Sequence, residues 1–483
     1  MSSGATTKSR YFRQTPRKWF LRILAMLLIC LGLFHLISTI AFPNDSSLFK
    51  RRFGKEGQSA LEAKRGDWCT GKEYLDGEWL KRDEEVTLPR LREIFKYTDG
   101  GVFACLARDS PRGTMPPQGD PEHYARILEK AQYEWKPKSG CRTHEWDGWN
   151  FAKLVGDSLA DQIYRAVHFT LVTPRNSLFM INGSPERIFN ISVNPAHPNA
   201  LRLAKEAGVS VERFERPVFN YWREHHLIHR DELDHVFKGL WHYVPWVGGP
   251  TFAQNGWIHD RSWWYELWTE LLAQPIRLVP REDGTTPKEE ASTISFNSAP
   301  HWTTTELWPE HTRRIVRDED LLRGWVGTFT IVMQKVAQVA QENDVIAWWR
   351  STVPGQVDCR QYTAPENNRT NHLSTLNPNA TGFNWHLYPT MDRYASTRLG
   401  YKPFDSNQYL GPTRDALRYL DLWSMSVKRP DAHLNPQVDC SHFCQPGIPN
   451  EWLQFIWHLT LLEAKNDDYD RPNGKWWASR IEL

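Results

Sequence analysis

Short apolar runs and amphipathic stretches alternate along most of this chain. Runs rich in β-branched and apolar residues predict strands at 152–155, 188–193, 209–214, 293–297 and 345–349. Apolar residues spaced three and four apart predict helices at 159–167, 200–207 and 323–343. Gly208 follows the second of these helices, where it suits a C-cap. Strands that alternate with helices indicate an α/β fold, with a mostly parallel sheet flanked by helices on both faces.

Two polar segments directly follow predicted strands. The turn Gly156-Asp157-Ser158 comes after the strand at 152–155, and Asn297 closes the strand at 293–297. In open α/β sheets, ligands bind beyond the carboxyl ends of the strands. We therefore expect Ser158 and Asn297 at the ligand-binding edge of the sheet.

The N-terminal part predicts a membrane anchor. The stretch 23–42 is almost wholly apolar and about long enough to cross a bilayer as a helix. The short segment before it is rich in lysine and arginine, which favours a cytoplasmic N-terminus and a luminal body. A cleaved signal peptide is the competing interpretation, but the apolar stretch is long for one and no clear cleavage motif follows it. The expected order is a cytoplasmic tail at 1–22, a signal anchor at 23–42, a stem at 43–64 and a luminal domain at 65–483.

The composition is that of a globular protein. Of 483 residues, 40% are hydrophobic and 24% are charged, and the net charge is only +2. A charge so close to zero, without a long basic stretch in the body, does not favour nucleic acid as a partner. The 24 tryptophans are the unusual feature of the composition. We expect most of them in the core, although an exposed indole can also stack on a sugar ring.

The cysteines and glycosylation motifs fit an oxidising, luminal compartment. Apart from Cys30 in the apolar stretch, the cysteines are even in number, which favours disulfides, but their spacing leaves the pairing open. They are Cys69, Cys105, Cys141, Cys359, Cys440 and Cys444. Asn-x-Ser/Thr motifs, the acceptors of N-glycans, occur at Asn44, Asn182, Asn190, Asn368 and Asn379.

Two segments far apart in the chain supply the groups that a serine nucleophile needs. Ser158 opens a predicted helix, so its own N–H and the positive end of the helix dipole can stabilise an oxyanion. Asp439 stands three residues before His442, a spacing that lets the carboxylate orient the imidazole. A hydroxyl, an imidazole and an orienting acid form a catalytic triad where they meet in space. Each segment alone also fits an ordinary turn or loop, and Ala160 replaces the second glycine of a G-x-S-x-G elbow.

Asn297 is a candidate for the oxyanion hole of such a triad. It lies just past a strand end, in Ser295-Phe296-Asn297-Ser298. An amide N–H at that place can stabilise a developing oxyanion by about 3 kcal/mol. Taken alone, the same asparagine fits an ordinary turn.

The last part of the chain resembles a known family. It reads Asp439-Cys440-Ser441-His442-Phe443-Cys444-Gln445-Pro446-Gly447-Ile448-Pro449-Asn450-Glu451-Trp452. Together with Gly156-Asp157-Ser158, this block is similar to the trichome birefringence-like and PC-esterase group of polysaccharide O-acetyltransferases, which have the GDSL/SGNH hydrolase fold. Further segments that match the pattern are Cys69-Thr70-Gly71, Asp76-Gly77-Glu78-Trp79, Trp135-Lys136-Pro137, Trp348-Trp349-Arg350 and Arg429-Pro430-Asp431-Ala432-His433. The likeness covers about residues 69–462.

The resemblance implies a role for each candidate residue. Ser158 would be the nucleophile, His442 its base and Asp439 the residue that orients the base. Asn297 and the N–H of Ser158 would form part of the oxyanion hole. The resemblance also implies the disulfides Cys69–Cys141, Cys105–Cys444 and Cys359–Cys440, two of which would hold the Asp439–His442 segment. It implies no bound cofactor, and the acetyl donor, acetyl-CoA or a membrane-delivered acetyl group, would be a co-substrate.

Three departures from the family pattern bear on the substrates. The segment that ends at His301 has one residue more than the family's N-x-x-H-W string. Ala160 and Asp161 replace the arginine and asparagine that commonly follow G-D-S-L, and Phe443 replaces a tryptophan. These changes leave the triad intact and leave the donor and acceptor open.

Two charged clusters suggest different kinds of site. A histidine cluster lies beside Asp231 and Asp234, and we expect two of its members, His225 and His229, on one face of a helix. The cluster consists of His225, His226, His229 and His235. No H-E-x-x-H motif is present, so we interpret these histidines as part of a solvated polar helix and expect no metal site. The triplet Asp318-Glu319-Asp320 resembles the metal–nucleotide motif of Golgi glycosyltransferases, but no apolar strand precedes it, so a solvated helix start is expected.

The sequence therefore predicts a Golgi, type II membrane O-acetyltransferase that acts on the hydroxyls of a glycan or polysaccharide. A carbohydrate acetylesterase would use the same triad, with water in place of the sugar. Two further hypotheses are a type II Golgi glycosyltransferase, which the α/β topology would suit, and a non-catalytic glycan-binding protein, which the tryptophans would suit.

Overall fold

The computed structural model describes most of the chain after the predicted stem. The described residues are 68–96, 101–105, 121–144, 153–171, 178–182, 188–239, 258–274, 277, 279–280, 292–309, 316–343, 345–369, 383–399, 417–437 and 439–467. Among them, no helix combines the length and the apolar character needed to cross a membrane. The predicted tail, anchor and stem, residues 1–64, lie outside the described residues.

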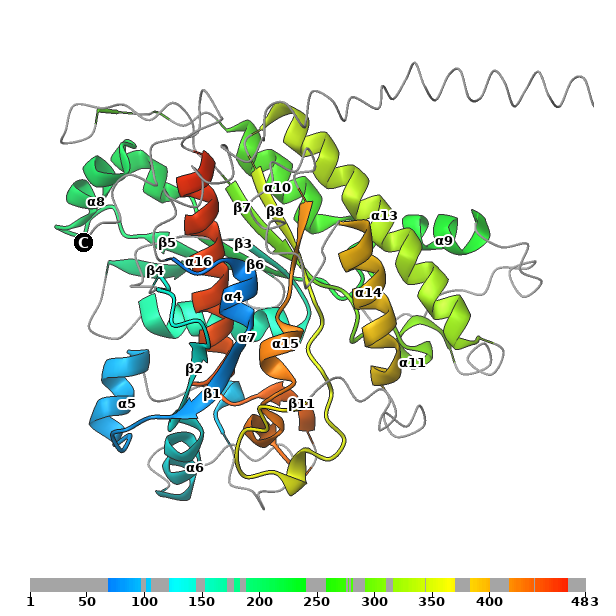
Figure 1. Ribbon diagram of the computed structural model, residues 1–483. Coiled ribbons are helices and arrows are strands. Elements are labelled where there is room, and N and C mark those ends of the chain that lie inside the picture. Colours follow the sequence, from blue (N-terminus) through cyan, green and yellow to red (C-terminus); the bar gives the residue numbers. More distant parts are fainter. Residues whose placement is uncertain are drawn as a thin grey trace, which may run out of the picture. The chain divides into compact units, whose positions relative to one another are not determined.

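A mixed sheet of seven strands lies at the centre of the described structure (Figure 1). Its strands follow the spatial order β4-β5-β6-β3-β7-β8-β9. The strands from β6 to β9 in that order are parallel, and β5 is antiparallel to both of its neighbours. Their bounds are β3 (Lys153–Gly156), β4 (Phe179–Asn182), β5 (Ile188–Val193), β6 (Phe219–Arg223), β7 (Ser292–Phe296), β8 (Val345–Arg350) and β9 (Leu417–Leu420). The predicted α/β class with a mostly parallel sheet is confirmed.

Helices pack on both faces of the sheet, and each face has its own apolar core (Figure 1). One core involves α7 (Ser158–Leu171), α8 (Ala200–Ala207) and α16 (Ile448–Asp467). The other involves α9 (Arg230–Gly239), α10 (Trp263–Ala273), α13 (Asp318–Glu342) and α14 (Tyr388–Arg398). Trp348 belongs to the first core and Trp349 to the second, because successive side chains of a strand point to opposite faces.

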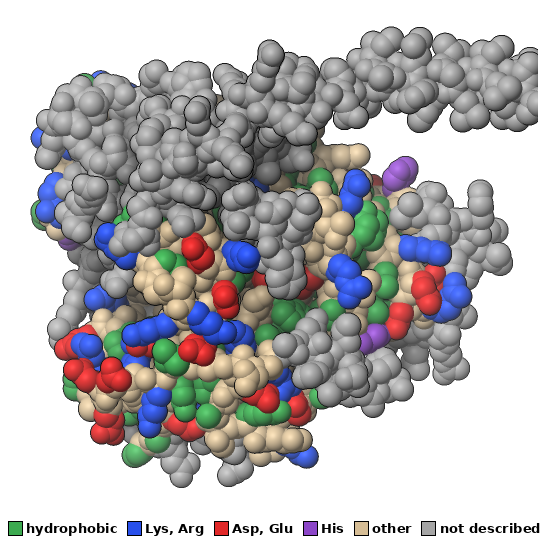
Figure 2. Space-filling view, in the orientation of Figure 1, with side chains coloured by type: hydrophobic (Ala, Val, Ile, Leu, Met, Phe, Trp, Pro, Cys, Tyr) green, Lys and Arg blue, Asp and Glu red, His purple; other side chains and the backbone are tan. Residues whose placement is uncertain are grey.

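Smaller elements surround the main sheet. Two of them are two-stranded antiparallel sheets, β1 (Gly77–Lys81) with β2 (Tyr133–Pro137) and β10 (His433–Asn435) with β11 (Asp439–Phe443). Besides η2 (Val211–Glu215), the remaining helical segments of the described residues are α4 (Gly71–Leu75), α5 (Leu88–Phe95), η1 (Gly101–Phe103), α6 (Pro121–Ala131), α11 (Thr304–Leu307), η4 (Cys359–Gln361), η6 (Trp385–Leu387), α15 (Trp423–Ser426) and η7 (Pro430–Ala432). Figure 2 shows acidic and basic side chains interspersed over the part of this face formed by α5, α6, β1 and β2, so neither sign dominates there.

One predicted strand is wrong. A 3₁₀ helix, η2 (Val211–Glu215), takes up most of the predicted strand 209–214. Only Val209 and Phe214 of this segment are buried, and the chain folds back through a hydrogen bond from Arg213 N–H to the Ser210 carbonyl (3.0 Å). The segment therefore packs through its two ends. A short pattern of apolar and polar residues fits such a helical turn as well as it fits a strand.

Candidate active site

Ser158 is placed by the turn between β3 and α7. Asp157 caps the helix, because its Oδ1 accepts the N–H of Leu159 (2.9 Å) and its carbonyl accepts the N–H of Asp161 (3.1 Å). Ser158 is the first residue of α7 and is partly exposed, whereas Asp157 is fully buried. Because β3 lies inside the parallel part of the sheet, its carboxyl end brings Ser158 to the edge that the sequence predicted.

Asp439 and His442 lie on β11, a segment that the sequence pattern indicates as a loop. β11 pairs with β10 through His433 opposite Phe443 and Asn435 opposite Asp439. Its sequence, Asp-Cys-Ser-His-Phe, has no run of apolar residues, so nothing local indicates a strand. The pairing depends on contacts to segments that are distant in the chain.

The structure brings the three predicted residues into hydrogen-bonding contact. Ser158 Oγ lies 2.7 Å from His442 Nε2, and His442 Nδ1 lies 2.8 Å from Asp439 Oδ2. The second carboxylate oxygen, Asp439 Oδ1, accepts the backbone N–H groups of Ser441 and His442, each at 3.0 Å. With Nδ1–H donating to Asp439, the Nε2 lone pair is directed at the serine hydroxyl, which is the arrangement of a hydrolase triad.

Electrostatics make His442 a stronger base than an ordinary histidine. Burial alone would lower the pKa of His442, but the hydrogen bond and the charge of Asp439 outweigh it, and the pKa is raised. Burial alone would raise the pKa of Asp439, but its hydrogen bonds from His442 and Ser441 hold the pKa at about 2. Asp439 is therefore ionised at neutral pH and stabilises the imidazolium that forms when His442 takes a proton.

Gln162 ties the helix of the nucleophile to the strand of the base. It lies on α7, one turn after Ser158, and its side chain binds both backbone groups of Phe443, donating to the carbonyl (2.5 Å) and accepting the N–H (3.2 Å). The side chain of Gln445 in turn donates to the carbonyl of Gln162. These contacts align α7 with β11, and sequence reasoning missed them because a lone glutamine gives no signal.

The three disulfides are those that the family resemblance implied. They are Cys69–Cys141, Cys105–Cys444 and Cys359–Cys440. Cys440 lies between Asp439 and His442, and Cys444 directly follows β11. Two covalent bonds therefore hold the strand that carries the acid and the base.

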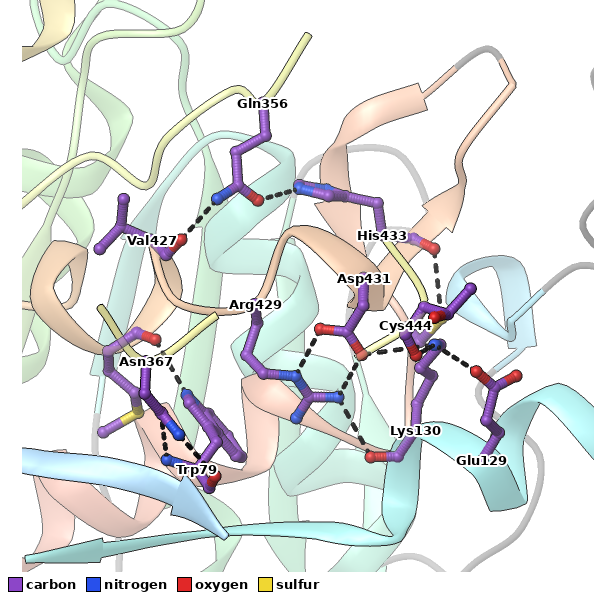
Figure 3. A network of polar contacts seen from close by, with 12 residues as sticks. Trp79, Glu129, Lys130, Gln356, Asn367, Val427, Arg429, Asp431, His433 and Cys444 are labelled. Carbon is purple, nitrogen blue, oxygen red and sulfur yellow. Dashed lines mark hydrogen bonds and ion pairs between the residues drawn. The ribbon is translucent and has the colours of Figure 1, made fainter. Parts of the chain in front are cut away.

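A buried polar network supports β10, the strand that pairs with β11 (Figure 3). His433 Nε2 lies 2.6 Å from Gln356 Oε1, and burial lowers the pKa of His433 to about 4, so its ring is neutral at neutral pH. Beside it, Asp431 lies between two cations, 2.9 Å from Arg429 Nε and 3.3 Å from Lys130 Nζ. Since a buried charge is stable only when paired, this network favours one position of the β10–β11 pair.

Asn297 lies where the sequence predicted, directly after β7, but one of its amide hydrogens is already engaged. Its Nδ2 donates to the carbonyl of Arg350 (3.0 Å), and its Oδ1 is buried without a hydrogen-bond partner among the described residues. The predicted oxyanion contact would fall to the second amide hydrogen. By contrast, the N–H of Ser158 has no acceptor in the part of the chain that the structure describes, so it remains available to an oxyanion.

The glycosylation motifs differ in their surroundings. Asn368 is exposed in a turn, which suits an acceptor. Asn190 is half-buried inside β5, and its Oδ1 accepts a hydrogen bond from Asn220 Nδ2 (2.6 Å), which does not suit one. Asn182 ends β4, and Asn44 and Asn379 lie outside the described residues.

The expected solvated histidine helix is wrong in two respects. α9 begins at Arg230, so His225, His226 and His229 all precede it, and His225 does not share a helix face with His229. His225 and His226 are also buried and not solvated. His225 is buried, and its Nδ1 lies 2.7 Å from Glu306 Oε1, while His301 Nδ1 lies 3.1 Å from Glu306 Oε2. Burial lowers the pKa of His225 to about 3, despite its hydrogen bond to Glu306. Sequence reasoning did not connect His225 with His301 and Glu306, which are distant in the chain.

The acidic triplet behaves as a helix start. α13 begins at Asp318, and both Asp318 and Glu319 are exposed, as predicted. Asp320 is buried, and its Oδ2 accepts the N–H of Arg317 (3.0 Å). Asp320 therefore caps the N-terminus of α13, and the negative charges of the triplet interact favourably with the positive end of the helix dipole.

A scan against protein-family models finds none that matches this chain, and a search of curated proteins finds no significant match. The interpretation of the site therefore depends on the contacts among Ser158, His442 and Asp439 and on the sequence motifs that contain them.

Proposed function

We propose that this chain is an O-acetyltransferase that carries acetyl groups to the hydroxyls of a glycan or polysaccharide through an acyl-serine intermediate. The observation that carries the proposal is the hydrogen-bonded chain from Ser158 Oγ to His442 (2.7 Å) and from His442 to Asp439 (2.8 Å). The glycan acceptor and the transferase activity come from the sequence resemblance. The resemblance also implies an SGNH-type fold, and the mixed α/β sheet is compatible with that fold.

In the first half-reaction, Ser158 takes the acetyl group. His442 accepts the serine proton while Oγ attacks the acetyl carbonyl of the donor. The N–H of Ser158, at the positive end of α7, stabilises the oxyanion that develops. When the tetrahedral intermediate collapses, the leaving group of the donor takes the proton from His442, and acetyl-Ser158 remains.

In the second half-reaction, a sugar hydroxyl takes the place of the donor. His442 accepts the hydroxyl proton, the sugar oxygen attacks acetyl-Ser158, and Ser158 Oγ leaves with the proton returned by His442. Water at the same position would give an acetylesterase. The two activities differ only in which hydroxyl reaches the acyl-enzyme.

The disulfides support a secretory location for this chemistry. Disulfides persist in oxidising compartments and are rare in the cytosol, and three pairs of cysteines are bonded in the described structure. With the apolar stretch at 23–42, this supports a single-pass type II protein of the Golgi membrane with a luminal catalytic domain.

Mass spectrometry of the intact active-site peptide tests the proposal. The full-length chain, purified in detergent, is incubated with acetyl-CoA or with a small activated acetyl ester and quenched in acid. We expect one acetyl group on Ser158 in the wild-type protein and none in Ser158→Ala. Adding oligosaccharide acceptors should discharge the acetyl group faster than water does and should yield acetylated sugar.

The control is Ser441→Ala, which removes a hydroxyl on β11 that is not part of the triad. It should be acetylated on Ser158 like the wild type. A Ser158→Ala protein that still transfers acetyl to a glycan at the wild-type rate would contradict the mechanism. Discharge to water alone, with no effect of any sugar, would favour the esterase.

A further inference from the structure

Three potential metal ligands meet beyond the carboxyl ends of β6 and β7. His225 follows β6, His301 follows β7, and Glu306 lies on α11. β6 and β7 are both parallel to β3, which lies between them, so their carboxyl ends share one edge of the sheet. The Glu306 carboxylate lies between the two imidazoles, with one oxygen 2.7 Å from His225 Nδ1 and the other 3.1 Å from His301 Nδ1.

The spacing of these three side chains suits a single metal ion. One ligand atom from each residue lies within 4.8 Å of the other two. Ligand atoms around a tetrahedral zinc ion lie about 3.4 Å apart, given Zn–N and Zn–O distances of about 2.1 Å. Small movements of the side chains are therefore enough to admit an ion, and two neutral imidazoles with one carboxylate are ligands that zinc accepts.

The backbone around the ligands is fixed by contacts between their two loops. The carbonyl of His225 accepts the hydroxyl of Ser298, from the loop after β7 (2.7 Å). The carbonyl of His301 lies 3.2 Å from His226 Nε2, from the loop after β6. Thr303 caps α11 by accepting the N–H of Glu306 (3.1 Å). Each ligand therefore sits on a segment that another part of the site holds in place, as a preorganised metal site requires.

The site is open to solvent on one side. The His225 side chain is buried, whereas the His301 and Glu306 side chains are 14% and 18% exposed. An ion can therefore reach the ligands, and three protein ligands leave one position of a tetrahedral ion for water or a substrate oxygen.

We infer that His225, His301 and Glu306 form a binding site for one divalent transition-metal ion of the zinc class, with an open fourth position. This inference does not depend on the proposed acetyl transfer, because none of the three residues belongs to the triad. The two imidazole rings are stacked with centroids 3.5 Å apart and an angle of 14° between their planes. Binding requires the rings to splay, and the ring proton then resides on Nε2, so that each Nδ1 lone pair faces the ion.

Metal titration of the full-length chain tests the inference. The protein in detergent is stripped with a chelator, dialysed, and titrated with Zn²⁺; Co²⁺ serves as a spectroscopic probe of a tetrahedral site. We expect one tightly bound equivalent and the visible absorption of tetrahedral Co²⁺. His301→Ala and Glu306→Gln should each weaken the affinity by about 100-fold and abolish that absorption.

His229→Ala is the matched control. His229 comes from the same histidine cluster, is partly exposed, and lies 3.6 Å from Glu232 in a comparable histidine–glutamate pair. It should leave both the stoichiometry and the affinity unchanged. Thermal unfolding in chelator shows whether each variant is folded, and the partly exposed His301 makes His301→Ala the variant of choice if Glu306→Gln does not fold.

Two outcomes would overturn the inference. The first is a wild-type chain that binds no Zn²⁺ above the level of His301→Ala, in which case Glu306 only joins the two loops as a hydrogen-bond acceptor. The second is a bound equivalent that His229→Ala removes and His301→Ala does not, which would place the metal at His229 and Glu232.

Discussion

At the scale of single residues, the charge of Asp439 controls the protonation of His442. Replacing Asp439 with Asn keeps an oxygen for the N–H groups of Ser441 and His442 but removes the charge that raises the His442 pKa. It also places an amide N–H against Nδ1, which favours the wrong tautomer. We expect Asp439→Asn to lower kcat by about 10⁴-fold.

The pH profile of the same variant gives an independent check. His442 must be neutral to accept a proton, so activity falls as the pH drops through its pKa. In the wild type that pKa is raised, and without the Asp439 charge it falls. The acid limb of kcat/KM should therefore move to lower pH in Asp439→Asn, measured at a fixed donor concentration well below KM. An unchanged acid limb would show that another group titrates there.

A second residue-scale prediction concerns the buried cation behind the nucleophile. The Arg350 guanidinium is fully buried and has no hydrogen bond among the described residues, and its Nη2 lies 3.9 Å from Asp157 Oδ1. Asp157→Asn keeps the acceptor for the N–H of Leu159 but removes the nearby negative charge. Because a buried charge without its partner is costly, we expect a loss of about 3 kcal/mol in the free energy of unfolding.

A second substitution separates this effect from loss of the helix cap. Adding Arg350→Met to Asp157→Asn removes the unpaired cation and should restore most of the lost stability, as chemical denaturation of both variants would show. If the double variant is no more stable than Asp157→Asn alone, the charge pair is not the cause.

At the scale of elements, the Cys359–Cys440 disulfide matters more for the position of β11 than for the stability of the fold. Cys69–Cys141 provides a matched control, since it closes a loop of similar length, with a sequence separation of 72 against 81. Loop closure predicts that Cys359→Ser/Cys440→Ser and Cys69→Ser/Cys141→Ser each cost about 2–4 kcal/mol of stability. Cys440 alone lies between Asp439 and His442, so only the first pair should also reduce kcat per folded molecule, measured with active-site titration well below the unfolding temperature. Equal kcat in both variants would mean that hydrogen bonds alone hold β11.

The elements that the sequence predicts well are those with a strong local pattern. The bounds of β5 and α8 agree with the predicted 188–193 and 200–207. A short run rich in apolar and β-branched residues marks the strand, and the Gly208 cap marks the end of the helix. β11 was missed because the contacts that hold it come from partners far away in the chain. Gln162 binds the backbone of Phe443, and disulfides link Cys440 and the adjacent Cys444 to distant cysteines. Local pattern does not contain such contacts.

The same distinction applies to the candidate sites. Ser158, His442 and Asp439 could be identified because each stands in a recognisable motif, although their meeting depends on the fold. His225 stands in a histidine cluster and His301 in an altered N-x-x-H-W string, but neither pattern points to Glu306. The three residues meet only because β6 and β7 end at the same edge with β3 between them. Strand order is a property of the whole sheet, so it could not be read from the spacing of these residues.

At the scale of the whole molecule, the sheet separates two apolar cores that should respond independently to mutation. Trp348 and Trp349 are neighbours on β8, each only 1% exposed, and they point into different cores. In the second core, Trp349 contacts Trp325 and Phe329 edge-on. A tryptophan-to-phenylalanine change in either core should cost about 1–2 kcal/mol of stability.

Because the two indoles share no core, their effects should add. The free energies of unfolding of Trp348→Phe, Trp349→Phe and the double variant form a double-mutant cycle, measured by urea denaturation. We expect an interaction energy below about 0.5 kcal/mol. As a control, Trp349→Phe combined with Phe329→Leu, two residues of one core, should deviate from additivity by more. An interaction energy between Trp348 and Trp349 as large as that of the control pair would contradict this expectation. It would mean that the sheet transmits packing changes from one face to the other, so that the two cores together stabilise the edge of the sheet that carries Ser158.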